Sequence, residues 1–394
     1  MKTAGIIAEF NPFHNGHKYI IDTLKADGYR VVCVIGDDFT QRGDAAIISK
    51  YARARQALVC GADLCLLLPA PWSCSCAYNF ALGGVSILKS LGAVDTIAFG
   101  SECGDTEKLL FVSNAAHSQN IGTLLKKELE NGVTFAKARQ NALEKLIGND
   151  AKILENPNDT LATEYISAAQ SLGATFDFRA VKRIGCLHDS ETASGEFLSA
   201  SAIRQAIKEG NVDAIKEYMP SESFQILKEE IDLGKNADIL NLETAILAHL
   251  RRLRPSELLA VPEVAEGLHN KIIAAAQDAT TLLECYENAK SKRYTMARIR
   301  RIVMSSFLGI NLDFFGKEVP YIKVLGFNKN GEEILKNSKP TVPLLTRSRD
   351  YNNLHGEALD CFRIQNTAAD IYELSKSSRG IGGNEFRMGL VKTK

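Results

Sequence analysis

Two histidines near the start of the chain, His14 and His17, enclose a glycine, Gly16. An imidazole N–H can donate a hydrogen bond to a phosphate oxygen as negative charge shifts in a transition state. Gly16 has no side chain to keep the backbone away from a ligand. The spacing places both rings at the start of one helix, and a helix N-terminus suits a phosphate. We therefore expect phosphate chemistry here, with two surface histidines beside an ordinary turn as the alternative.

A second group of residues with phosphate-binding character lies far downstream, between residues 196 and 204. Ser199 and Ser201 offer hydroxyls beside the N–H groups of a helix start, and Arg204 lies near one turn further on. A guanidinium can hold phosphate oxygens bidentately. A serine N-cap followed by a solvated arginine is the alternative for this stretch taken alone. Together the two groups predict a polyphosphate site, with catalytic roles for His14, His17, Ser199, Ser201 and Arg204.

The histidine pair requires a strand, a turn and a helix to position it. Residues 6–8 form a short apolar run that is typical of a buried parallel strand. Pro12 lacks an amide donor and ends that run, and the helix that follows continues through Leu24 toward Gly28. This is the context of a nucleotide-binding turn, and it favours that interpretation over surface histidines.

Further strands alternate with helices along the first half of the chain. Apolar strand patterns cover residues 29–35, 62–69, 94–102 and 175–183. Strands that alternate with helices form a parallel sheet covered on both faces, so we predict a Rossmann-like α/β domain. The loop 37–44 follows the second strand, at the edge where such sheets bind ligands.

We divide the chain into three parts. An α/β domain covers residues 1–219, a mostly helical region covers 220–310, and a small C-terminal α/β lobe covers 311–394. The elements expected in the last part are strands at 320–327 and 342–346, a turn at 328–331, a helix over 354–374 and a mobile tail from 376 to 394.

The composition limits the class of protein. The chain has 394 residues, 45% of them hydrophobic, which is ample for a large core. Lys and Arg number 47, as do Asp and Glu, so any nucleic-acid surface must be a local patch. The nine cysteines form no Cys-x-x-Cys pair and predict reduced, buried thiols. With no signal peptide and no apolar run of membrane-spanning length, the expected location is the cytoplasm.

Positive charge is concentrated between residues 290 and 301, a stretch with six basic residues and no acidic one. Such a stretch is usually a solvated helix face. In a chain of zero net charge, however, this concentration favours contact with the phosphate backbone of a nucleic acid. The residues predicted to make that contact are Lys290, Lys292, Arg293, Arg298, Arg300 and Arg301.

Several motifs follow one another in an order that carries a family resemblance. They lie at residues 9–17, 41–43, 99–102, 157–158, 164–165, 182–185, 199–204 and 292–295. Jointly they resemble the bacterial tRNA(Met) cytidine acetate ligase family, whose superfamily of nucleotidyltransferases carries a His-x-Gly-His signature.

The resemblance implies an ATP-dependent ligase. Members of the family activate acetate as acetyl-adenylate and transfer the acetyl group to N4 of the wobble cytidine of elongator tRNA(Met), which gives N4-acetylcytidine. A wobble base suits this reaction because it is presented from a single-stranded loop. Magnesium is expected with ATP, although its ligands are unknown. The residues implied to bind ATP are Ile7, Ala8, Glu9, Phe10, Asn11, Pro12, Phe13, His14, Asn15, Gly16, His17, Lys18, Tyr19, Ile20, Gly100, Asn158 and Arg183.

The chain departs from the family pattern in a few places. It has Asp37-Asp38-Phe39-Thr40 where the family usually shows Gly-Asn-Phe-Val, and two carboxylates disfavour contact between that loop and an anionic substrate. Asp159 stands where a second Asn is common, and Ser201 where Thr is common. Two alternative functions are a small-molecule adenylyltransferase and a non-catalytic tRNA-binding protein. The long extension with its basic segment disfavours the first, and the intact catalytic motifs disfavour the second.

Overall fold

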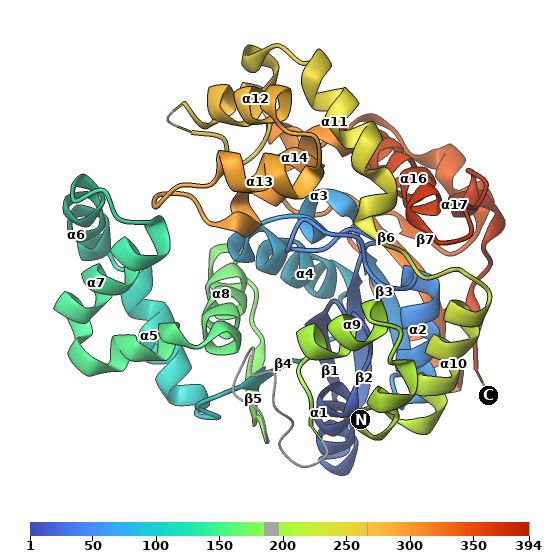
Figure 1. Cartoon of the computed structure of the whole chain (residues 1–394). Helices are drawn as coiled ribbons and strands as arrows, with labels where there is room; N and C mark the ends of the chain where they lie inside the picture. Colours follow the sequence, from blue (N-terminus) through green and yellow to red (C-terminus); the bar gives the residue numbers. More distant parts are fainter. Residues whose placement is uncertain (185–196, 266, 394) are drawn as a thin grey trace.

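The computed structural model describes residues 1–184, 197–265 and 267–393. Its centre is one sheet in the order β5-β4-β1-β2-β3-β6-β7, with β8 paired to β6. Helices surround the sheet, and the groups around α6 and α12 project away from it (Figure 1). The strands are β1 (Thr3–Ala8), β2 (Arg30–Gly36), β3 (Leu64–Leu68), β4 (Thr96–Ser101), β5 (Asp177–Lys182), β6 (Ile322–Phe327), β7 (Leu344–Leu345) and β8 (Val391–Lys392).

The predicted α/β class with a parallel sheet is confirmed. β1 pairs in parallel with β2 and β4, β2 with β3, and β4 with β5. β2 and β3 are almost continuously buried, as expected of strands covered on both faces. β6 differs, because it runs antiparallel to β3. The chain moves from β1 to β3 in one direction and then returns to place β4 on the other side of β1, so the order reverses there.

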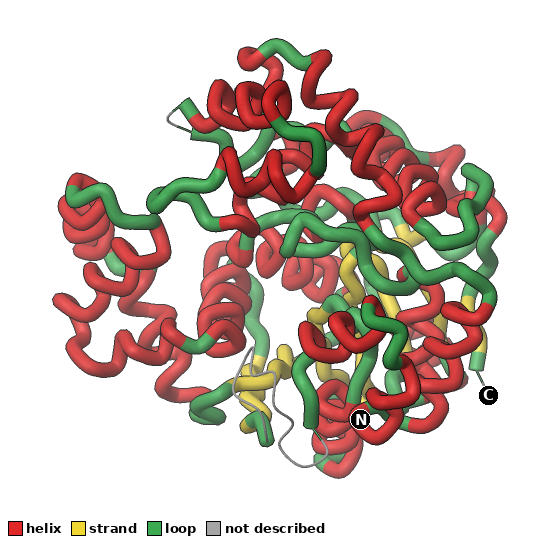
Figure 2. Tube along the Cα trace, in the orientation of Figure 1, coloured by secondary structure: helices red, strands yellow, loops and turns green. Residues whose placement is uncertain are grey.

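Two layers of helices cover the faces of this sheet (Figure 2). On one face, Ile21 and Leu24 of α1 (Asn15–Ala26) and Leu58 of α2 (Lys50–Val59) are buried. On the other face, α4 (Ala77–Leu91) and α8 (Pro157–Ser171) contribute residues such as Val85 and Ile166. The short helix α3 (Ala70–Ser73) carries the buried Trp72. Apolar burial on both faces therefore holds the strand ends in place.

Helices also dominate the segments that project from the sheet. α5 (Thr106–Ala116), α6 (Gln119–Glu130) and α7 (Phe135–Ile147) share a small core of their own with a 3-10 segment at Gly148–Glu155. The helical prediction for 220–310 is confirmed for the described residues of that range, where no strand occurs. Between residues 200 and 310 the described α-helices are α9 (Ala200–Lys208), α10 (Ser221–Asp232), α11 (Glu243–Arg252), α12 (Leu268–Asp278), α13 (Leu282–Ala289) and α14 (Met296–Leu308).

Two predictions for the C-terminal part are wrong. The expected turn at 328–331 is the start of α15 (Lys329–Asn337), because the Asn328 side chain accepts a hydrogen bond from the Gly331 N–H at 3.0 Å and caps the helix. The expected mobile tail is ordered after α16 (Gly356–Ser375). It forms α17 (Asn384–Arg387), in which Glu385 is buried, and then β8, which extends the sheet beside β6.

The division into three parts stays a prediction, although strands of the third part join the sheet of the first. Two motif residues, Gly185 and Glu196, lie outside the described residues. Among the helices of the described chain, none is both long enough and apolar enough to cross a membrane.

Candidate active site

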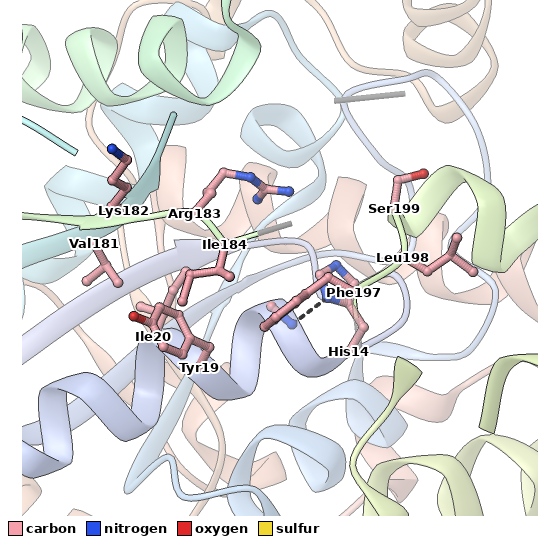
Figure 3. A pocket seen from close by; sticks show the side chains of 11 residues that line it. His14, Tyr19, Ile20, Val181, Lys182, Arg183, Ile184, Phe197, Leu198 and Ser199 are labelled. Atoms are coloured by element: carbon pink, nitrogen blue, oxygen red, sulfur yellow. Dashed lines mark hydrogen bonds between the residues drawn. The ribbon is translucent and has the colours of Figure 1, made fainter. Parts of the chain in front are cut away.

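The first turn after β1 fixes the orientation of both histidines. His14 is the N-cap of α1, and its Nδ1 accepts a hydrogen bond from the Gly16 N–H at 3.0 Å, drawn as a dashed line in Figure 3. The Nδ1 atom of His17 accepts from the His14 N–H at 3.2 Å. Because each Nδ1 is an acceptor, we assign the proton of each neutral ring to Nε2. Each ring therefore has an N–H donor on the side away from the helix backbone.

Both histidines are held in the neutral form. Burial, with a smaller effect from the positive charges of Arg183 and Arg204, lowers the pKa of His14 to about 3. Burial also lowers the pKa of His17 well below its ordinary value, with smaller effects from His14 and Arg183. The two rings stack with centroids 3.9 Å apart, which disfavours charge on either one. At neutral pH they can donate hydrogen bonds but carry no charge.

The second predicted group meets this turn in space. Ser199 is the N-cap of α9, where its hydroxyl accepts from the Ala202 N–H at 3.2 Å. Arg204 donates from Nη1 to the Asn11 carbonyl at 2.8 Å and from Nη2 to the Ser201 hydroxyl at 3.3 Å. The structure thus brings the start of α9 to the turn before α1, through a contact between Asn11 and Arg204, which are 193 positions apart in the chain.

A cavity of about 600 Å³ lies where these elements converge. His17 and Arg204 line it, together with Gly100 at the end of β4, Asn158 at the start of α8 and Arg183 just after β5. The cavity occupies the carboxyl edge of the sheet at the point where the strand order reverses, which is where open α/β sheets bind ligands. Its size is typical of sites for small molecules and cofactors.

A smaller pocket adjoins the same turn. Figure 3 shows His14 at the start of α1, Arg183 after β5 and Ser199 before α9 arranged around it. Tyr19 and Ile20 of α1 form its apolar side. Arg183 lines both the pocket and the larger cavity, where residues of both predicted phosphate-binding groups also lie.

Most of the residues implied to bind ATP line one of these two spaces, and the remainder face elsewhere. Phe13 is fully buried in the core. Lys18 forms an ion pair with Asp22, and the Asn15 side chain donates to the Glu217 carbonyl at 2.9 Å. Pro12 is buried and lines neither space.

Sequence reasoning left other cavity residues out of the predicted site. Gln41 and Arg42 line the cavity. Their position after the second strand, at the ligand-binding edge of the sheet, could have predicted this. Tyr165 also lines it and donates its hydroxyl to the Ile7 carbonyl at 3.1 Å. The family motif at residues 164–165 includes Tyr165, but no local pattern showed that this side chain, inside a helix, would reach the cavity.

The acidic pair of the 37–44 loop faces away from the cavity. Asp37 and Asp38 are buried and lie 2.7 and 2.9 Å from the Lys50 ammonium. Burial opposes the charge of Lys50, but the two carboxylates raise its pKa above the ordinary value. Arg53 also contacts Asp38, at 3.4 Å. Lys50 and Arg53 therefore balance the two carboxylates by which this chain differs from the family pattern. Neither Asp37 nor Asp38 lies on the cavity wall.

Asp159, the other departure, is also a structural residue. Its buried carboxylate accepts hydrogen bonds from the backbone N–H groups of Glu102 and Cys103, at 3.0 and 3.2 Å. Its neighbour Asn158 donates to Glu102 Oε1 at 2.5 Å. These contacts tie the start of α8 to the end of β4 and so shape one wall of the cavity.

Among the residues that the structure describes, the side chains do not form a magnesium site of their own. Glu9 and Glu155 are the carboxylate side chains that line the cavity, and Glu9 Oε1 already accepts from the Gln41 N–H at 2.8 Å. In the part of the chain that the structure describes, no group of three or more His, Cys, Asp or Glu could hold a metal ion. Magnesium needs several oxygen ligands, so its participation stays a prediction.

Comparisons with known proteins agree with this geometry. A family model described as HIGH Nucleotidyl Transferase matches residues 1–382. The tRNA(Met) cytidine acetate ligase of Thermoanaerobacter sp. (strain X514) is 37% identical, with 100% of both chains covered. That of Acetivibrio thermocellus is 33% identical, with 99% of this chain and 100% of the relative covered.

Solved structures are similar over the same length. The apo crystal structure of Thermotoga maritima TmcAL superposes with a TM-score of 0.93 at 29% identity, covering 100% of both chains. A second structure of that protein, bound with alpha-thio ATP, gives a TM-score of 0.91 at 29% identity and covers 100% of this chain and 99% of the other. The chain belongs to the tRNA(Met) cytidine acetate ligase family.

Proposed function

We propose that this chain acetylates elongator tRNA(Met) in two steps. In the first, a carboxylate oxygen of acetate attacks the α-phosphorus of ATP, the new O–P bond gives acetyl-adenylate, and the bond to pyrophosphate breaks. In the second, N4 of the wobble cytidine attacks the acetyl carbon, AMP leaves, and the amine loses a proton. The products are N4-acetylcytidine in the tRNA, AMP and pyrophosphate.

The observation that carries this proposal is the shared cavity of His17, Arg183 and Arg204. Displacement at phosphorus depends on positioning and on stabilising developing charge, more than on covalent help from the protein. His14 and His17 would donate their Nε2–H groups to phosphate oxygens without losing the proton. Arg183 and Arg204 would supply the positive charge that the departing pyrophosphate needs.

The rest of the cavity wall supports a nucleotide as the ligand. Apolar side chains of Ile7, Phe80, Phe99 and Leu161 line it beside the polar groups. A ligand with an apolar face and a charged end matches such a lining. ATP has both, because its base can pack on apolar side chains while its phosphates reach the arginines.

The tRNA would approach over the start of the predicted basic segment. Lys290, Lys292 and Arg293 are exposed between α13 and α14, where long cationic side chains can reach a phosphate backbone. The wobble base could then be presented from its single-stranded loop to the acetylated nucleotide.

The experiment that tests the proposal is mass spectrometry of nucleosides from tRNA(Met) incubated with the protein, ATP and isotope-labelled acetate. We expect labelled N4-acetylcytidine, which depends on ATP. Exchange of labelled pyrophosphate into ATP, measured without tRNA, isolates the first step and should require acetate. Exchange that depends on a different small molecule would indicate an adenylyltransferase, and tRNA binding without any exchange would indicate a non-catalytic protein.

A further inference from the structure

The backbone of Gln41, on the wall of the cavity, is tied from two sides. On the side of the sheet, its N–H donates to Glu9 Oε1 at 2.8 Å. On the other side, its carbonyl accepts from Arg301 Nη1 at 3.0 Å. Arg301 belongs to α14, 260 positions further along the chain. The helical region therefore contacts the 37–44 loop through a defined hydrogen bond.

Arg301 is itself fixed by a bidentate ion pair. Its Nε and Nη2 atoms donate to the two carboxylate oxygens of Glu263, at 2.7 and 2.6 Å. The side chains are only 13% and 12% exposed, so solvent screens this pair weakly. Arg298 donates twice to the Glu263 carbonyl, at 2.9 and 2.6 Å. All three nitrogens of the Arg301 guanidinium are thus engaged with the protein.

Glu263 also has an uncommon backbone conformation. Its φ is +65°, in the left-handed region that residues with a side chain rarely adopt. Apart from Phe10 in the catalytic turn, it is the non-glycine residue with positive φ among those described. Such a conformation persists where the surrounding contacts determine it, and it occurs often at functional sites.

The loop and the helix are in direct backbone contact as well. Gly43 has φ +65°, and a Cβ atom built there would lie 2.5 Å from the carbonyl carbon of Arg300 and 2.6 Å from the nitrogen of Arg301. Only glycine permits this approach. Because the loop rests on the helix backbone at Gly43, a displacement of Arg301 is transmitted to Gln41 and Arg42.

We propose that Arg301, oriented by Glu263, is a positioning residue for the ATP cavity, because it determines the place of Gln41 and Arg42. The inference rests on the proposed function and deepens it. It divides the basic segment into an exposed part before α14, directed at RNA, and an inward part. In the inward part Arg298 holds the Glu263 backbone, and Arg301 holds both Glu263 and the 37–44 loop. Arg301 already donates from all three guanidinium nitrogens to acceptors in the protein, and its side chain is only 13% exposed, which disfavours a contact with a tRNA phosphate.

The test compares two readouts in the full-length protein: acetate-dependent pyrophosphate exchange without tRNA, and tRNA affinity by filter binding at fixed salt. Arg301→Gln should lower kcat/KM for ATP in exchange by about tenfold or more, because small displacements of positioned groups slow a reaction strongly. The tRNA affinity measured by filter binding should stay at the wild-type value. The matched control is Arg252→Gln, which removes an exposed arginine from α11 and should leave exchange unchanged.

Two further variants separate geometry from charge. Arg301→Lys keeps the charge but lacks the planar fork, so exchange should stay low, whereas a purely electrostatic role would be rescued. Glu263→Gln removes a negative charge. Our inference expects slower exchange from it, and a direct contact of Arg301 with RNA expects normal exchange with tighter tRNA binding.

Normal exchange with weakened tRNA binding in Arg301→Gln would overturn the inference. If wild-type protein shows no acetate-dependent exchange, the proposed function fails by itself. Calorimetric affinities for ATP in the wild type and Glu263→Gln then test the inference separately, and equal affinities would refute it. If Arg301→Gln does not fold, as judged by thermal unfolding, Arg301→Lys and Glu263→Gln supply the same comparison.

Discussion

Two groups of buried polar side chains lie at the carboxyl edge of the sheet, and they differ in charge. After β1, His14 and His17 are neutral. Their Nδ1 atoms accept from backbone N–H groups, so their Nε2–H groups remain available to donate to a ligand. After β2, Asp37 and Asp38 are charged and paired with Lys50 inside the protein. The two histidines are held neutral and oriented, whereas the charges of Asp37 and Asp38 are balanced by Lys50 inside the protein.

The charged group draws its partners from distant parts of the chain. Lys50 lies 2.6 Å from Glu385 of α17, and Glu385 also contacts Lys323 of β6. Burial and the neighbouring Lys50 lower the pKa of Lys323. Arg53 donates to the carbonyls of Glu9 and Gly36, at 2.6 and 2.8 Å, and so links the two strand ends. The charged group therefore supports the loop behind the cavity.

The largest expected effect is the loss of stability when the buried charged group loses one of its side chains. Lys50→Met leaves two buried carboxylates without their ammonium, so the free energy of unfolding should fall by about 3–5 kcal/mol. Urea denaturation measures this change. Arg55→Met, which removes the half-exposed ion pair with Glu229, is the control and should cost less than about 1 kcal/mol. Equal effects of the two substitutions would mean that the buried group contributes no more to the free energy of unfolding than an exposed ion pair does.

Loss of a histidine tests the neutral group. His17→Ala removes an N–H donor from the cavity and should lower acetate-dependent pyrophosphate exchange by about 100- to 1000-fold, the usual effect of losing a donor that stabilises developing charge. Binding of tRNA, measured by filter titration, should persist because the basic segment is intact. Full exchange activity in this variant would remove the role assigned to His17.

The pH dependence of stability sharpens the contrast between neutral and charged groups. The pKa of His14 is lowered from 6.5 to about 3, so the unfolded chain binds the proton more readily than the folded one. The lowered pKa leaves the free energy of unfolding unchanged above pH 6.5. As the pH falls from 6.5 toward 3, it reduces that free energy progressively. His14→Asn keeps a capping acceptor but cannot titrate. Between pH 7 and pH 5, its free energy of unfolding should therefore fall by about 2 kcal/mol less than that of the wild type.

Urea denaturation of wild type and His14→Asn at pH 7 and pH 5 measures this difference. Parallel losses in the two proteins would show that the folded histidine titrates normally.

The smallest expected effect concerns the exposed part of the basic segment. Replacing Lys292 and Arg293 by Gln should weaken tRNA binding and reduce the slope of log affinity against log salt by about 1 to 2. Filter binding at several salt concentrations measures this slope. An unchanged slope would place the RNA surface elsewhere.

Much of the fold could be predicted because its signals are short-range. The apolar runs of β1 to β5 and the serine and histidine helix starts each depend on a few adjacent residues. The turn predicted at 328–331 failed because Asn and Gly favour both turns and helix caps, and only packing against Asp63 decides between them. The cavity residues of the two histidine and serine stretches were predicted, but Tyr165 was not, since its contact with Ile7 spans 158 positions.

By itself the sequence determined the order of strands and helices and the donors that stand at two helix starts, since these depend on local hydrogen bonds and on apolar periodicity. Only the tertiary structure decided which charges face the ligand cavity and which face inward. Lys50 and Arg301 each have one partner far away in the chain, Glu385 and Gln41 respectively, and no local pattern encodes such pairs. The physical reason is burial. A charge inside the protein is costly unless it is paired, and the folded structure determines which opposite charge lies beside it.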